Sequence, residues 1–360
     1  MKFGVTVVPR ASDWKLFVDL EAMGYDAAWA ADSQMLYSDC YAVLALAAAN
    51  TQRIRLGTGV SVAGVRLAPV TAHSIATVNQ LAPGRVFLGI GTGHTAMRVM
   101  GKDPVKAGAF REYLRVLRAL LHGQEVDYDL GGERNAIRFL HPAMGFIDVA
   151  HPVPIYVAAD GPLALRTAGA YGDGRVCSHN QTQARLQKSL EAMQEGAKQV
   201  GRTLPGDFHT AALTYACVLE PGEKPTSDRV IDTIGPMAAA TLHYWWELYQ
   251  KDGDTGTVAG RCRNLWDEYL AFTRKMETPL TRRYQQVHTG HCAFLPAEER
   301  RFITEDLIRS TGGLVGPPDE IIAMIREREA MGLGEITLLP AMAEARRTLR
   351  DFAEKVIARY

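Results

Sequence analysis

The sequence predicts a (β/α)8 barrel, in which eight parallel strands close into a cylinder inside a ring of helices. Eight short apolar runs are spread along the 360 residues, and stretches with apolar residues at helical spacing separate the early ones. The runs are almost continuously apolar, as expected of parallel strands covered by helices. Alternation of this kind repeated eight times favours a closed barrel over an open doubly wound sheet.

The expected strands are short and the expected early helices longer. The strands are residues 2–8, 27–30, 54–60, 85–90, 154–158, 174–178, 210–219 and 335–339. The early helices are residues 12–23, 40–50, 70–82 and 106–122. The last of these contains FREYLRVLRALLHG, whose apolar residues fall on one face, so we expect that face to pack against the sheet.

A long segment between the last two strands departs from the alternation. About 115 residues separate Leu219 from Glu335, far more than one crossover helix requires. Because the segment reads as helical, we predict a helical insertion at about 225–312 within a single domain covering 1–360.

Aromatic residues are frequent in this insertion. We expect them to cover the barrel mouth and shape a substrate pocket, or to form the subunit interface of a homodimer or higher homo-oligomer. They are Trp245, Trp246, Tyr249 and Trp266. Their helical spacing leaves a third role open, that of core residues.

Composition favours a small-molecule function. Forty basic and forty acidic side chains give a formal net charge of zero, which removes the electrostatic argument for a nucleic-acid or membrane partner. No apolar run approaches the roughly 20 residues that span a bilayer, and the first residues lack the features of an export signal. The five cysteines are widely spaced and odd in number. We therefore expect a cytoplasmic protein with reduced thiols.

Small residues dominate the predicted carboxyl ends of the strands, where the active sites of such barrels lie. Glycine, alanine and serine there would give backbone atoms access to a planar ligand and leave room for a ring system. The positions are Val7, Asp32, Ser33, Gly59, Val60, Ser61, Gly91, Thr92, Gly93, His94, Ala158, Ala159, Asp160, Gly161 and Ser178.

The run GIGTGH at 89–94 resembles a dinucleotide-binding turn but lies in the wrong context. That fingerprint needs a third glycine where this chain has His94, and an acidic residue about 20 positions on at the end of a strand. We interpret the run as the end of the fourth barrel strand, with glycines leaving space beside a flat cofactor.

A phosphate site is predicted after the fifth strand. In AADGPLALRTAG, Asp160 or Gly161 would be the N-cap and Pro162 the first helical residue, so the free amides at the helix start can bind an anion. Ser178, with His179 and Asn180 behind it, would end the adjacent strand and could add donors.

At this point the sequence resembles the bacterial luciferase-like superfamily of flavin- or deazaflavin-dependent oxidoreductases, which are (β/α)8 barrels. It looks most like the branch that contains methylenetetrahydromethanopterin reductase. The resemblance covers the barrel in order but leaves out the insertion. The similar stretches are residues 24–33, 51–69, 75–101, 154–174 and 315–340.

The resemblance implies roles for several residues. Gly59 and Val60 fall where the family has a bulged third strand, often with a cis peptide, behind the flavin ring. Asp160 to Leu163 match the segment that holds the cofactor phosphate, with Ser178 on the adjacent strand. Ser33 stands where many relatives have histidine, so a histidine acid or base is absent there. Gln181 replaces a lysine that binds substrate phosphate in a sugar dehydrogenase relative, which argues against a sugar phosphate substrate.

His94 and Asp32 are the candidate catalytic residues. His94 stands where a deazaflavin-using relative has a catalytic glutamate, and an ordinary histidine pKa near 6.5 allows either acid or base chemistry. Capping of the following helix is the alternative role of His94. Asp32 is expected to bind or orient more than to react, and capping of the next segment is equally compatible.

The cofactor decides the reaction. We expect reduced FMN and a monooxygenase reaction on a small organic substrate, with a separate flavin reductase as a partner. The close alternative is hydride transfer with the deazaflavin coenzyme F420. A further alternative, to which Ser33 points, is a flavin-binding or partner protein without activity.

The insertion also contains HTGHC, with His288, His291 and Cys292. His-x-x-His can ligate a metal from one helical face, but Thr289 and Gly290 make a regular helix doubtful there and no fourth ligand is evident. We therefore predict no metal.

Overall fold

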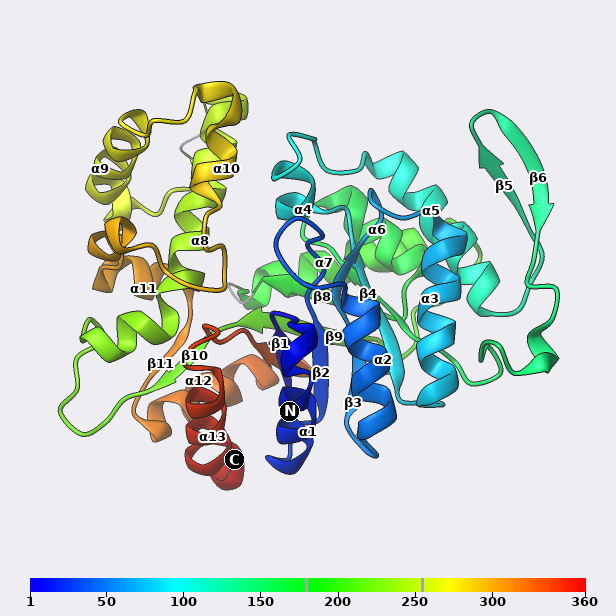
Figure 1. The fold of residues 1–360 in the computed structure, drawn as a ribbon, viewed down its shortest axis with the longest axis horizontal. Coiled ribbons are helices and arrows are strands. Elements are labelled where there is room, and N and C mark those ends of the chain that lie inside the picture. Colours follow the sequence, from blue (N-terminus) through cyan, green and yellow to red (C-terminus); the bar gives the residue numbers. More distant parts are fainter. Residues whose placement is uncertain (179–180, 254–255) are drawn as a thin grey trace.

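The structure, a computed structural model, describes residues 1–178, 181–253 and 256–360. Within these ranges eight parallel strands close into a barrel in the order β1, β12, β9, β8, β7, β4, β3, β2 (Figure 1). The predicted (β/α)8 barrel is therefore confirmed. The strands are β1 (Lys2–Val7), β2 (Ala27–Ala30), β3 (Arg55–Val62), β4 (Val86–Gly91), β7 (Ile155–Ala158), β8 (Gly174–Ser178), β9 (His209–Thr214) and β12 (Glu335–Leu338).

Helices surround the barrel and bury their apolar faces on it. In α5, for example, Phe110, Leu114, Leu117 and Leu121 recur every three or four residues and are all buried. The main core of the protein lies in this layer between strands and helices. The surrounding helices are α1 (Lys15–Ala22), α2 (Cys40–Asn50), α3 (Ala68–Leu81), α5 (Ala107–Leu121), α6 (Pro162–Tyr171), α7 (Gln183–Lys198), α12 (Pro318–Ala330) and α13 (Ala345–Lys355).

Aromatic side chains fill the inside of the barrel. The rings of Trp29 and Phe87 lie with centroids 4.3 Å apart, and Tyr156 packs beside both. The indole Nε1 of Trp29 donates to Glu335, a fully buried carboxylate, at 2.7 Å. Because this packing closes the interior, a ligand of the barrel has to bind at its mouth, over the carboxyl ends of the strands.

The predicted seventh strand, residues 210–219, is two strands. β9 ends at Thr214, and β10 (Ala216–Val218) pairs in parallel with β11 (Leu314–Gly316) outside the barrel. The apolar pattern runs through both because Ala216, Cys217 and Val218 are also buried. Continuous burial therefore hid the break between them.

An exposed hairpin projects from the barrel and was not predicted. It joins β5 (Val126–Leu130) to β6 (Glu133–Ile137) in antiparallel pairing and stands clear of the helices in Figure 1. Gly131 and Gly132 form the turn with φ of 70° and 91°, conformations that favour glycine. Its strands are mostly polar and solvent-exposed, so the apolar pattern used to find barrel strands is missing.

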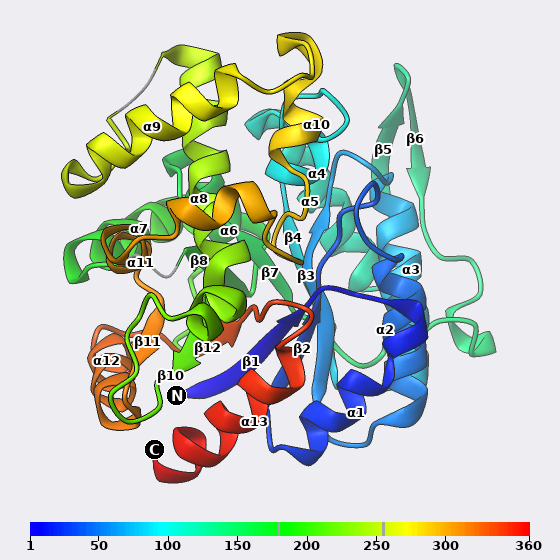
Figure 2. The ribbon, with the colours of Figure 1, turned by 60° about the vertical axis from the view of Figure 1, so that its left-hand side comes forward.

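The insertion between β10 and β11 is helical, as predicted, and has a core of its own. It contains α8 (Asp228–Asp252), α9 (Arg263–Arg274), α10 (Arg283–Val287) and α11 (Glu305–Thr311). Figures 1 and 2 show it on one side of the barrel. A small apolar cluster joins the two parts at the mouth. This cluster contains Val8 and Leu339 from the barrel strands' ends and Met237, Ala240, Cys292 and Ala293 from the insertion.

The described helices include none that combines the length and apolar character needed to cross a membrane.

Candidate functional site

The third strand is bulged at the barrel mouth. Its pairing with β4 shifts register between Thr58 and Ser61, and the peptide bond between Gly59 and Val60 is cis. The bulge directs Val60 into the barrel, where it packs with the aromatic interior and Ala158. The geometry implied by the family resemblance is therefore present, while contact of Gly59, Val60 and Ser61 with a cofactor stays a prediction.

The glycines of β4 do not leave empty space beside a cofactor, and that interpretation is wrong. A Cβ on Gly89 would lie 2.2 Å from the carbonyl oxygen of Thr58, and one on Gly91 would lie 3.2 Å from Val60 and Ala158. At Gly93 it would meet Val62 at 2.4 Å. The glycines are needed because the bulged β3 packs against them. The backbones of Gly91, Thr92 and Gly93 remain candidates for cofactor contact.

Asp32 is buried beneath the mouth and bound on several sides. Its Oδ2 accepts hydrogen bonds from Ser61 Oγ and the Val62 amide, each at 3.2 Å, and from the guanidinium of Arg66. Arg66 also donates to Asp39 at 3.0 Å. The carboxylate thus ties the end of β2 to the bulge of β3, which is a structural role; the binding, orienting and catalytic roles expected of Asp32 stay predictions.

Val7 and Ser33, two other predicted cofactor residues, also lie at strand ends. Val7 is buried in the layer between barrel and helices but also lines the cleft beside β1, and the next residue, Val8, lies in the mouth cluster. The carbonyl of Ser33 accepts hydrogen bonds from the amides of Leu36 and Tyr37 and so begins a turn.

His94 begins the short helix α4 (His94–Arg98) at the end of β4, with Gly93 as a left-handed N-cap. Its ring is exposed at the mouth and lies edge-on to Tyr244 of α8, with centroids 6.2 Å apart. Loss of hydration beside the insertion lowers the pKa of His94 below its ordinary value; the nearby charge of Glu247 opposes this and that of Arg98 adds to it. The ring is therefore neutral at pH 7 and can accept a proton.

The predicted anion site has the expected local structure. Gly161 is the N-cap of α6 and Pro162 its first residue, no side chain caps the helix, and Gly161, Pro162 and Leu163 are exposed. Asp160 is paired with Arg175 at 2.8 Å, which offsets its negative charge. Phosphate binding here stays a prediction.

The residues around this helix start divide between the barrel and the helix layer. Ala158 borders the barrel interior and Ala159 is buried towards the helices. The Ser178 amide lies 3.4 Å from Asp160 Oδ2, and its hydroxyl is 3.3 Å from Gln181 Nε2. His179 and Asn180 lie outside the described residues.

The insertion contributes different residues to the mouth than predicted. Trp245, Trp246 and Trp266 are buried in the insertion's own core, with Tyr249 packed against it, so they do not line the mouth. Their helical spacing signalled core packing. Tyr244 beside His94 is the aromatic residue of α8 that reaches the barrel.

A cleft of about 380 Å³ lies where the insertion meets the ends of β1 and β12. Val8, Arg10, Phe294, Pro340 and Met342 line it. A second groove of about 400 Å³ lies between α5, α6 and α7, and Leu163 of the predicted anion site is among the residues that line it.

The histidines of HTGHC come together with a third that sequence reasoning missed. His243 on α8 lies beside His288 and His291, with Glu247 one turn further along α8. The available signal was the spacing of His243 and Glu247, which lie four residues apart on a helix. The aromatic residues between them instead determined how this segment was interpreted from the sequence.

A (β/α)8 barrel with a bulged third strand, a histidine after the fourth and an uncapped helix after β7 defines a class of barrel proteins whose ligands bind at the mouth. The chain belongs within that class to the luciferase-like monooxygenase family, whose model matches residues 11–335.

Two curated relatives are similar in sequence. A 5,10-methylenetetrahydromethanopterin reductase of Methanolobus tindarius is 33% identical over 224 residues, which cover 60% of this chain and 65% of the relative. An F420-dependent glucose-6-phosphate dehydrogenase of Beutenbergia cavernae is 38% identical over 172 residues, covering 45% and 48%. The chain thus spans about half to two thirds of these relatives.

A solved structure is similar over the whole chain. It is a coenzyme F420-dependent tetrahydromethanopterin reductase from Methanopyrus kandleri, with a TM-score of 0.69, 20% identity, and coverage of 100% of this chain and 99% of that one. Likeness at this identity shows the fold alone.

Proposed function

We propose that this protein is an F420-dependent oxidoreductase that transfers a hydride between the deazaflavin and a small organic substrate at the barrel mouth. The observation on which this depends is the sequence similarity of the barrel to relatives that include an F420-dependent dehydrogenase at 38% identity. The sequence alone led us to prefer FMN and a monooxygenase reaction; the relatives favour the alternative, F420.

The described residues fit a flat cofactor with an anionic tail. The first amides of α6 have no side-chain cap, so they can bind a phosphate. The guanidinium of Arg175 lies under the same turn, where Nε donates to the Ala159 carbonyl at 2.7 Å and Nη1 is buried without a partner. The bulge at Gly59 and Val60 would support one face of the ring.

The chain's own task is to orient the substrate, exclude water and move a proton. When bound, F420 supplies or accepts the hydride. His94 is placed to exchange the accompanying proton, because its neutral ring can take a proton from a substrate hydroxyl and return it in the reverse direction. Tyr244 and the cluster around Val8 and Cys292 border one side of the mouth with apolar surface.

Separate titrations with F420 and with FMN test the proposal. We expect the absorption and fluorescence of F420 to change on binding with saturation near one equivalent, and FMN to compete weakly or not at all. Binding of FMN alone would return the assignment to a monooxygenase. Binding of neither would contradict an enzyme of this kind.

A further inference from the structure

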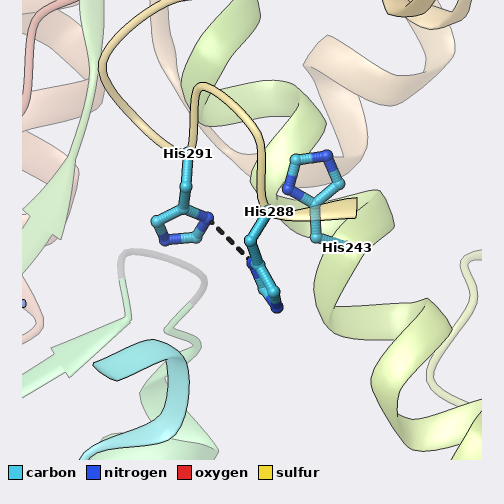
Figure 3. Close-up of side chains that lie close together, drawn as sticks. All are labelled: His243, His288 and His291. Atoms are coloured by element: carbon cyan, nitrogen blue, oxygen red, sulfur yellow. Dashed lines mark hydrogen bonds between the residues drawn. The ribbon is translucent and has the colours of Figure 1, made fainter. Parts of the chain in front are cut away.

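Three histidine rings meet in the insertion, away from the groups used in the proposed reaction. His243 comes from α8, His288 follows α10, and His291 lies three residues later (Figure 3). One ring nitrogen from each lies within 4.8 Å of one from each of the others. HTGHC is a turn here, not a helix, because Gly290 adopts a φ of 74°. The turn is what brings His288 and His291 to the same side.

Nε2 of each ring already has a polar partner. Nε2 of His288 lies 2.6 Å from Glu247, and Nε2 of His243 lies 3.0 Å from Glu299. Nε2 of His291 lies 3.2 Å from Thr95 Oγ1 on α4. A carboxylate on Nε2 keeps the proton there and leaves a lone pair on Nδ1, which is the arrangement around metal-binding histidines.

The Nδ1 atoms, on the other side of each ring, do not all have a hydrogen-bond donor. Nδ1 of His288 is 3.5 Å from Nδ1 of His291, the contact drawn as a dashed line in Figure 3. Nδ1 of His243 is buried and has no hydrogen-bond partner. The residue itself is only 1% exposed, so an unsatisfied ring nitrogen there is costly without a ligand.

The charges beside the rings are suited to a cation. Glu247 and Glu299 are 8% and 3% exposed, and both point at the cluster. Tyr269 donates to Glu299 at 3.2 Å without offsetting its charge. Arg98 lies 3.9 Å from Glu247 and offsets part of the negative charge of that carboxylate. With neutral rings the cluster is therefore net negative.

We propose that Nδ1 of His243, His288 and His291 form a binding site for a divalent transition metal of the zinc class. Ligands on a tetrahedral zinc, about 2.0–2.1 Å from the metal, lie roughly 3.3 Å apart. The 3.5 Å between Nδ1 of His288 and Nδ1 of His291 is close to this value. One nitrogen from each of the three rings lies within 4.8 Å of the others, so the proposal requires the rings to move closer together when the metal binds. Three protein ligands leave the fourth position for water or another small ligand.

Such a metal would hold two parts of the insertion together. It would join α8 to the segment after α10, and the contact between His291 and Thr95, already present without metal, connects that segment with α4, beside His94. The site is independent of the cofactor proposal, because none of its three ligands belongs to the cofactor-binding positions.

Metal content tests the proposal directly. The full-length protein is treated with a chelator, equilibrated with Zn²⁺ or Co²⁺, freed of excess metal and analysed by elemental mass spectrometry. We expect about one ion per chain and visible absorption bands from bound Co²⁺. His243→Ala and His288→Ala should lose the ion, while His73→Ala, at an exposed histidine on α3, should retain it.

Weaker variants keep the test valid if the buried substitutions unfold the chain. His291→Gln alters the half-buried ligand, and Glu247→Gln removes the partner of His288. We expect Glu247→Gln to bind the metal 10- to 100-fold more weakly. Failure of the folded wild-type protein to retain Zn²⁺ or Co²⁺, or equal retention by wild type and a folded His243→Ala, His288→Ala or His291→Gln variant, would overturn the proposal.

Discussion

Alanine substitutions at Gly89 and Gly91 test why β4 ends in glycines. At Gly89 the added Cβ would meet the backbone oxygen of Thr58 at 2.2 Å, so β3 and β4 would have to separate. At Gly91 its nearest neighbours are side-chain carbons of Ala158 and Val60, both at 3.2 Å. A small rotation of Val60 and a slight shift of the backbone at Ala158 relieve this second contact.

The two costs should therefore differ. Overpacking a well-filled site usually costs 1–3 kcal/mol, so we expect Gly89→Ala to lower the free energy of unfolding by about 3 kcal/mol and Gly91→Ala by about 1 kcal/mol. Unfolding entropy is roughly 2.1 cal/mol/K per residue, which makes the first change a loss of about 4 °C in Tm for this chain.

Thermal denaturation of the cofactor-free variants measures these effects, and F420 titration shows whether binding changes separately. A Gly89→Ala protein with the wild-type Tm but weakened cofactor binding would refute the packing argument. It would mean that the glycine leaves room for the ring after all.

Three further changes have defined outcomes. In urea denaturation, Asp32→Ala should lower the free energy of unfolding by about 3 kcal/mol, because it leaves Arg66 without its buried partner. Asp39→Ala, which removes the exposed partner and the N-cap of α2, should cost only about 1 kcal/mol in the same measurement. The Arg229 guanidinium holds the pKa of Glu223 at about 2, below its ordinary 4.5, so this pair stabilises the fold above pH 4.5 and the effect fades as the pH falls towards 2. Glu223→Gln should destabilise at pH 7 and much less at pH 2.5, and equal losses at both values would contradict that linkage. His94→Gln should reduce turnover 10²- to 10⁴-fold with little change in cofactor affinity. The lowered pKa of His94 keeps its ring neutral at pH 7, so wild-type turnover in the direction in which His94 accepts the substrate proton should hold at pH 7 and fall only below pH 6.5. Unchanged turnover in the His94→Gln variant would exclude the assigned role.

The barrel could be predicted from the sequence because its strands and helices show their burial in their periodicity. The apolar patterns of RVFLGI and FREYLRVLRALL indicate which residues face the core, and in the structure these stretches form β4 and α5. The β5–β6 hairpin buries little, so its only local signal was the Gly131-Gly132 pair. The break at Tyr215 was hidden because both strands beside it are buried.

The candidate site was predictable where it depends on local sequence. The N-cap at Gly161 follows from Asp-Gly-Pro, and the bulge at Gly59 follows from the family resemblance. What fills the space beside Gly89 depends on Val60 and Trp29, which come from other strands. The histidine cluster depends on a turn that brings His291 to His243, which lies 48 residues earlier in the chain, and no spacing rule gives that contact.

The pairing of β10 with β11 makes the insertion replaceable as a unit. Val218 and Leu314, where the chain leaves and returns, lie on adjacent parallel strands two residues out of register. At about 3.3 Å per residue along a strand and 4.8 Å between strands, these points are less than about 10 Å apart. A linker of a few residues could bridge them, so the part of the molecule that shapes one side of the mouth can be exchanged while the cofactor barrel is kept.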